Sequence, residues 1–121
     1  MGTFDRLQAL RPYAIWDGAV ARALHGEKLT VAVVDLEPNV AVPEHRHLNE
    51  QLGFVAEGSI TMTVGGDSRE LRRGDTYVIA SDLPHAALAG PEGATVIDVF
   101  SPPRADWEAL ERPEPSPGAW P

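Results

Sequence analysis

From Tyr13 onward, apolar and polar residues alternate in short runs. The clearest run is 59–64, in which Ile, Met and Val occupy every second position between Ser and Thr residues. A period of two residues is typical of a half-buried β-strand. The Gly65-Gly66-Asp67 segment that follows supplies the positive φ angles of a tight hairpin, so 59–64 is predicted to pair with 67–71. Further strands are predicted at 19–25, 29–36, 51–57, 76–79, 85–89 and 94–100.

The spacing of these seven to nine strands indicates the fold class. The connections are too short for crossover helices, so the sheet is predicted to be antiparallel and the fold all-β, a sandwich or a barrel. A chain of 121 residues is the size of one domain and buries enough surface for an apolar core of its own.

The two ends of the chain have a different pattern. A short helix is predicted over 4–10, closed by Pro12. A second is predicted to start at Ser101-Pro102-Pro103, because Ser caps helices and Pro tolerates the first turn, and to end before Pro113. The Pro-rich tail after it is either an extended strap or disordered. We therefore expect an N-terminal segment at 1–12, a β-domain at 13–101, and a helix with tail at 102–121.

The amino-acid composition limits the cell compartments and the classes of binding partner that we expect for this protein. The chain has no Cys, which excludes disulfides, thiolate metal sites and Cys nucleophiles and favours a cytoplasmic protein. No run approaches the ~20 apolar residues of a membrane-spanning helix. Ten Lys and Arg residues are scattered among 18 acidic ones, for a net charge of -8, so we expect neither a membrane nor a nucleic-acid partner.

Candidate metal ligands lie at His45-Arg46-His47, Gln51 and His85. On a strand, residues i and i+2 face the same side, so His45 and His47 can address one ion. Nitrogen and oxygen ligands from three segments suit Zn, Ni, Fe or Mn better than Ca or Mg. The alternative is an ordinary pair of surface histidines. Adjacent strand residues face opposite sides, so only one of Glu50 and Gln51 can join the histidines.

A second group of candidates lies at the last predicted strand. Asp98 shares a face with Phe100 where the neighbouring pattern is apolar, and a buried acid is costly unless it is paired or protonated. Arg104 follows two prolines and offers a planar fork suited to a carboxylate. The alternatives are a structural Asp98–Arg104 pair, or an exposed Arg104 paired with Glu108.

These motifs resemble the cupin superfamily over most of the chain. HRHLNEQLGFVAEG at 45–58 is similar to the first cupin motif, with Gln51 where glutamate is usual, and the segment from Gly74-Asp75 to Pro84-His85 is similar to the second. In the second motif, Ala80, Asp82 and Ala89 replace the usual Pro, Gly and Asn. The resemblance implies a single-domain jelly-roll β-barrel that holds one divalent metal ion, often as a homodimer.

A narrower resemblance includes DVFSPPRADW at 98–107. Together with the first motif, it is similar to the small cupins of pectin and alginate breakdown, the KdgF type. That resemblance favours Gln51 over Glu50 and implies a metal set of His45, His47, Gln51 and His85. It also implies that Asp98 transfers a proton, that Arg104 binds a substrate carboxylate, and that Phe100 packs against the sugar ring.

The implied reaction converts 4,5-unsaturated monouronates to linear keto forms by hydration and ring opening, without redox chemistry. A metal-dependent dioxygenase and a small-molecule binder without turnover are the alternatives. A neutral Gln51 would leave the ion near its full +2 charge, so a small anionic sugar can bind despite the acidic surface. Trp16 and Tyr77 are interpreted as core or dimer-interface residues rather than sugar contacts.

Overall fold

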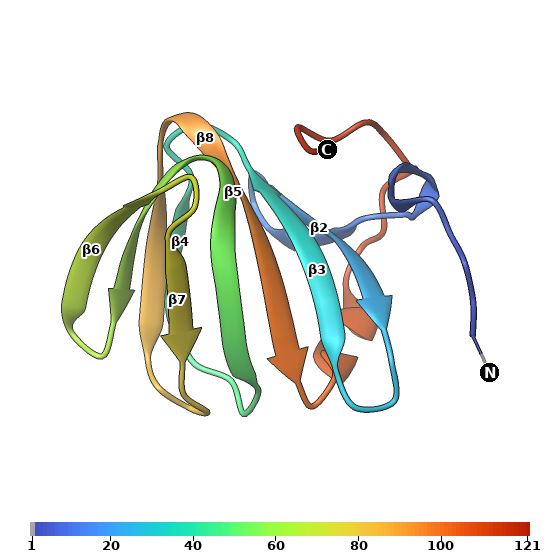
Figure 1. The fold of residues 1–121 in the computed structure, drawn as a ribbon, viewed down its shortest axis with the longest axis horizontal. Helices are drawn as coiled ribbons and strands as arrows, with labels where there is room; N and C mark the ends of the chain where they lie inside the picture. Colours follow the sequence, from blue (N-terminus) through green and yellow to red (C-terminus); the bar gives the residue numbers. More distant parts are fainter. Residues whose placement is uncertain (1) are drawn as a thin grey trace.

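The computed structural model describes residues 2–121 and shows eight strands and two short 3₁₀ turns (Figure 1). All the strand pairs are antiparallel, as predicted. The elements are η1 (Leu7–Ala9), β1 (Tyr13–Trp16), β2 (Ala19–His25), β3 (Thr30–Leu36), β4 (Ala41–His45), β5 (Glu50–Val64), β6 (Asp67–Arg72), β7 (Thr76–Ile79), β8 (His85–Ser101) and η2 (Ala105–Ala109).

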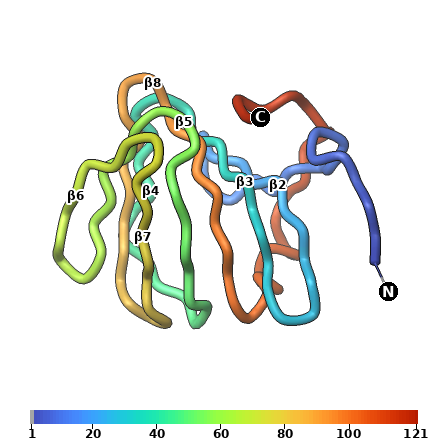
Figure 2. The backbone as a smooth tube through the Cα atoms, in the orientation of Figure 1, coloured from blue at the N-terminus to red at the C-terminus, as the bar shows by residue number. Residues whose placement is uncertain are grey.

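The strands form one sheet that curls over itself. Its order is β1-β2-β3-β8-β5-β6, with β4 on β8 and β7 on β5. The two long strands, β5 and β8, pair along nearly their whole length and run through both halves of the sheet (Figure 2). The inward faces of the two halves enclose the apolar core, in which Val55, Ile60 and Ile79 are almost fully buried. The all-β prediction is confirmed.

β5 and β8 correct one detail of the predicted strand pattern. The segments 51–57 and 59–64 are one strand rather than two, and so are 85–89 and 94–100. Gly58 has a φ of 74°, and a Cβ at this position would lie 2.1 Å from the carbonyl oxygen of Gly93. Bulges here bend the strand pair without ending it, because the pairing resumes at Ile60 opposite Ala89.

The chain ends differ from the predicted helices. The helix predicted over 4–10 is wrong, since only the 3₁₀ turn η1 forms there. After β8, Ser101 does not cap a helix but donates from its hydroxyl to the carbonyl of Lys28, and a 3₁₀ turn begins at Ala105. Of the two alternatives for the tail, the structure has the strap, because Arg22 donates to the carbonyl of Trp120 at 2.8 Å.

The strands all lie between Tyr13 and Ser101, while the division into segments at 12 and 101 stays a prediction. Within residues 2–121, no helix has the length and apolar character needed to cross a membrane.

The outer face of the sheet over β2, β3, β8, β5 and β7 carries neighbouring apolar side chains. Cross-strand partners form one row across five strands: Leu24, Val31, Val99, Leu52 and Val78. Three of these, together with Phe54, are exposed by more than 40%. We call this row and Phe54 the outer apolar face.

Candidate metal centre

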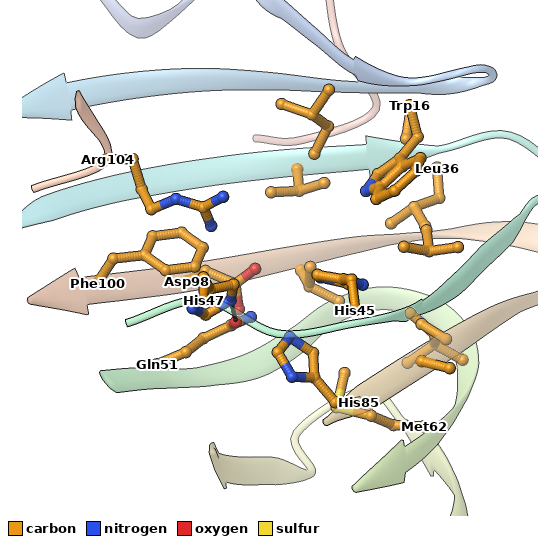
Figure 3. Close-up of a pocket in the computed structure, with 18 of the residues that line it drawn as sticks. Trp16, Leu36, His45, His47, Gln51, Met62, His85, Asp98, Phe100 and Arg104 are labelled. Carbon is orange, nitrogen blue, oxygen red and sulfur yellow. Dashed lines mark hydrogen bonds between the residues drawn. The ribbon is translucent and has the colours of Figure 1, made fainter. Parts of the chain in front are cut away.

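Three histidines from separate segments meet inside the barrel (Figure 3). His45 ends β4, His85 begins β8 as its register partner, and His47 lies in the connection to β5. One ring nitrogen from each lies within 4.8 Å of the others. His47 is therefore not on the strand, yet its ring joins those of His45 and His85.

Backbone carbonyls fix the orientation of all three rings. The Nδ1 atoms contact the carbonyl oxygens of Pro43, Asn49 and Leu83 at 2.8, 3.0 and 2.8 Å, respectively. A carbonyl only accepts, so each Nδ1 carries a proton, and in the neutral form of each ring Nε2 presents a lone pair. This support of the distal nitrogen is what metal-ligating histidines need. The Nε2 of His85 is buried and has no hydrogen-bond partner among the described residues.

Gln51 completes the cluster, whereas Glu50 is exposed. Gln51 is 7% exposed, and its Oε1 lies 3.1 Å from Nε2 of His47. Burial, with a further contribution from the Arg104 charge, lowers the pKa of His47 to about 4, so this imidazole is neutral at pH 7. The Gln51 side chain is also hydrogen-bonded to Asp98, a contact in which the amide NH₂ donates. Two lone pairs therefore face each other at His47 and Gln51.

This donor set fits a divalent transition metal. Three neutral imidazoles and one amide oxygen are ligand types that Zn, Ni and Fe accept. A cation between them would satisfy both the facing lone pairs and the orphaned nitrogen of His85. No anionic ligand offsets the charge of such an ion, so its attraction for a substrate oxygen would be strong.

Asp98 lies next to this cluster on β8 and is 5% exposed. Tyr77 of β7 donates its hydroxyl to Oδ1 of Asp98 at 2.5 Å. Burial raises the pKa of Asp98 to about 6, although the hydrogen bonds from Tyr77 and Gln51 oppose the shift. Burial and the neighbouring Asp98 also raise the pKa of Tyr77, which keeps it a donor. The carboxyl group therefore changes protonation state near neutral pH.

Gly53 makes the contact between Tyr77 and Asp98 possible. It lies in β5 between the two, as the register partner of each. A Cβ on Gly53 would be 2.3 Å from Oδ1 of Asp98 and 2.6 Å from the Tyr77 hydroxyl. The sequence analysis missed this role. The available signal was a glycine inside a strand, which often marks a close approach.

Arg104 stands at the same end of the barrel and is 11% exposed. It donates from Nε and Nη2 to the two carboxylate oxygens of Asp106, at 3.1 and 2.9 Å. Its guanidinium carbon lies 4.7 Å from the ring centroids of both Phe100 and Trp107. Neither alternative ion pair forms, because Arg104 bonds to neither Asp98 nor Glu108. Asp106 is a further residue that the sequence analysis missed.

Asn49 ties the histidine loop to the segment that carries Arg104. Its buried amide donates to the carbonyls of Pro102 and Pro103. The carbonyl of Asn49 accepts from Nδ1 of His47. One residue thus links the position of a predicted ligand to that of the predicted carboxylate binder.

The three histidines, Gln51, Asp98 and Arg104 line a cavity of about 310 Å³. Tyr77 and Trp16 are part of its wall, and the Trp16 ring centroid is 5.5 Å from that of His45. Tyr77 is 8% exposed and belongs to the buried core, as interpreted from the sequence, whereas Trp16 is 38% exposed.

Comparisons with known proteins agree with this geometry. A family model described as "Cupin domain" matches residues 32–100. The pectin degradation protein KdgF of Dickeya dadantii is 34% identical over 68 residues, which cover 56% of this chain and 62% of the relative. The chain thus spans a little under two thirds of that relative. The dimethylsulfoniopropionate lyase DddW of Ruegeria pomeroyi is 30% identical over 69% of this chain and 53% of the relative.

Among solved structures, KdgF from Halomonas sp. superimposes with a TM-score of 0.80 at 27% identity, covering 88% of this chain and 98% of the other. Sequence motif, barrel and histidine cluster agree, and the predicted jelly-roll fold is confirmed. The chain belongs to the cupin domain family, as a small KdgF-like cupin.

Proposed function

We propose that this protein is a metal-dependent enzyme that converts 4,5-unsaturated monouronates to linear keto forms by hydration and ring opening. One observation carries the proposal: a cluster of three His residues and one Gln shares a cavity with a buried carboxyl group and an arginine. The similarity to two proteins named KdgF, one of them described as a pectin degradation protein, supports it.

His45, His47, Gln51 and His85 would hold one divalent ion, either Zn, Ni, Fe or Mn. When bound, that ion would supply a Lewis acid that polarises a substrate oxygen. The histidines contribute tautomers that the backbone fixes in advance, so little reorganisation accompanies metal binding.

Arg104 would orient the substrate through its carboxylate. The bidentate contact with Asp106 and the two aromatic rings hold the guanidinium in place. A positioned fork loses little conformational freedom when it binds a second carboxylate. Phe100, which is buried beside Arg104, would shape the wall against which the sugar ring packs.

Asp98 would transfer the proton. Burial raises the pKa of this group to about 6 in the metal-free protein, and a bound +2 ion would favour its ionised form, which can accept a proton and then return it. Asp98 would protonate the enol ether carbon or accept the proton of the attacking water. Tyr77 fixes the orientation of the carboxyl group by donating to one of its oxygens.

The test is an incubation of metal-loaded protein with the unsaturated monouronates from a pectate or alginate lyase digest. The near-UV absorbance of the conjugated double bond should disappear faster than it does spontaneously. Asp98→Asn should abolish this acceleration while keeping the metal, whereas Asp67→Asn on exposed β6 serves as the matched control. A fully active Asp98→Asn protein, or an unchanged rate with each of the four metals, would refute the proposal. Oxygen consumption with Fe(II) would instead indicate a dioxygenase. Ligand binding without turnover would indicate a small-molecule-binding protein.

We also propose that the protein is a cytoplasmic homodimer. The absence of Cys supports the location. The outer apolar face supports the dimer, because it contains no charged residue and can pack against a second copy of itself as one sheet on another. Two copies that each carry a net charge of -8 can approach through such an uncharged patch.

A further inference from the structure

The cavity has two chemically different halves. Arg104, Phe100 and Gln51 lie on one side, Trp16, Leu36 and Met62 on the other, and the histidines between them (Figure 3). The second side, which we call the apolar half, is lined by Trp16, Leu36 and Met62, and the strand register adds Val34, Ala87 and Val96 to it.

The strand register explains this division. Along β8, the inward positions 100 and 98 carry Phe and Asp, and the next one is Val96, opposite Val34 of β3. On the facing half of the sheet, the His45–His85 pair is followed by Ala87, which pairs with both Val42 and Met62. Inward residues on a strand are ~7 Å apart. Both walls therefore change from polar to apolar at the same depth.

The apolar half is poorly suited to a fully hydroxylated ligand. None of its residues has a charged group, and its one polar side-chain group is the indole N–H of Trp16. A hydroxyl buried there would give up its hydrogen bonds to water without gaining replacements. Hydrocarbon loses nothing on entering and gains from leaving water.

We propose that the cavity also binds small carboxylates that carry an alkyl or aryl group. The carboxylate and an adjacent oxygen would occupy the side of the histidines and Arg104, and the hydrocarbon would extend along Val96 and Met62. This inference rests on the proposed metal site but not on the proposed ring opening.

The test is calorimetric titration of the Zn-loaded protein with pyruvate, 2-oxobutanoate, 2-oxopentanoate and 2-oxohexanoate. The head group is constant through this series, and each member adds one CH₂. A fully buried CH₂ contributes ~0.8 kcal/mol, or about fourfold in affinity, so 2-oxohexanoate should bind about 60-fold more tightly than pyruvate. Equal affinities through the series, or no binding of any member at millimolar concentration, would overturn the proposal.

Ala87→Leu tests the location, because it adds bulk inside the apolar half. It should weaken 2-oxohexanoate binding at least tenfold and leave pyruvate binding unchanged. Ala41→Leu is the matched control, since Ala41 is exposed on β4. Equal effects of the two variants would also refute the assignment. If Ala87→Leu fails to fold, the affinities of the wild-type protein for the four 2-oxo acids still test the proposal. Because uronate turnover is not measured, failure here and failure of the proposed reaction are separate results.

Discussion

Asp98→Asn should raise the free energy of unfolding of the metal-free protein at neutral pH. The same substitution should remove the activity of the metal-loaded protein. Burial raises the pKa of Asp98 from 3.8 to about 6 in the folded state. The folded state therefore binds the proton more tightly than the unfolded state does. Stability is highest when the carboxyl group is protonated in both states, below about pH 4, and falls as the pH rises to about 6. Above that pH, the destabilisation caused by burying the ionised carboxylate no longer changes with pH.

The shift sets the size of the effect. At ~1.4 kcal/mol per pKa unit, a difference of about two units corresponds to about 3 kcal/mol in the free energy of unfolding. The substitution removes the titrating group and keeps an oxygen that accepts from Tyr77. The variant should thus match the wild type near pH 4 and exceed it by up to about 3 kcal/mol at pH 8.

Urea denaturation at several pH values between 4 and 8, with a chelator present, measures this difference. The chelator is needed because a nearby +2 ion would favour the ionised carboxylate. Other acids and histidines titrate in the same range, but they are shared by both proteins and cancel. Asp67→Asn, at an exposed position, should show no comparable gain. If Asp98→Asn raised the free energy of unfolding equally at every pH, or if the wild type were the more stable protein at pH 8, this account of Asp98 would be refuted.

Four further outcomes are expected. Gly53→Ala should lower the free energy of unfolding by about 1–3 kcal/mol through overpacking. It should also lower kcat, because the added Cβ would displace the Tyr77–Asp98 contact. Thermal unfolding and enzyme kinetics measure these two effects, and an unchanged kcat would contradict the expectation. Arg104→Lys should raise KM about 10- to 100-fold with little change in kcat, since Lys lacks the planar fork; a fall in kcat alone would argue against carboxylate binding. Gln51→Glu should tighten metal binding and raise KM, because its charge offsets the ion, as metal titration and kinetics would show. Leu52→Lys should convert a dimer to a monomer in light scattering, and an unchanged mass would rule out the outer apolar face as the interface.

The sequence predicted the strands well where the signal is local. The alternation at 59–64 and the turn at Gly65-Gly66 are sufficient to specify the β5–β6 hairpin. The continuity of β5 past Gly58 was not predictable in the same way. A glycine with positive φ ends a strand in a turn but only bends it in a bulge, and the difference depends on Gly93, which is distant in sequence.

The same limit applies to the candidate site. The sequence suggested His45, His47 and His85, because ligand types and spacing are local signals, and the structure brings the three together. Tyr77 and Asn49 gave no such signal. Tyr77 acts on a residue 21 positions away, and Asn49 on carbonyls more than 50 positions away. Such roles depend on strand register, which the sequence pattern alone did not provide.

The net charge of -8 and an anionic substrate are compatible because the two act over different distances. Charges on the surface are screened beyond ~8 Å at physiological ionic strength. Asp106 lines the cavity, and it is already bound to Arg104, which lowers the pKa of this carboxyl group. Asp98, with a pKa of about 6, is mostly ionised at physiological pH, but it offsets at most one unit of the +2 charge of an ion. A metal ion with four neutral ligands would therefore dominate the local field, and the acidic exterior would mainly exclude polyanions rather than a single small carboxylate.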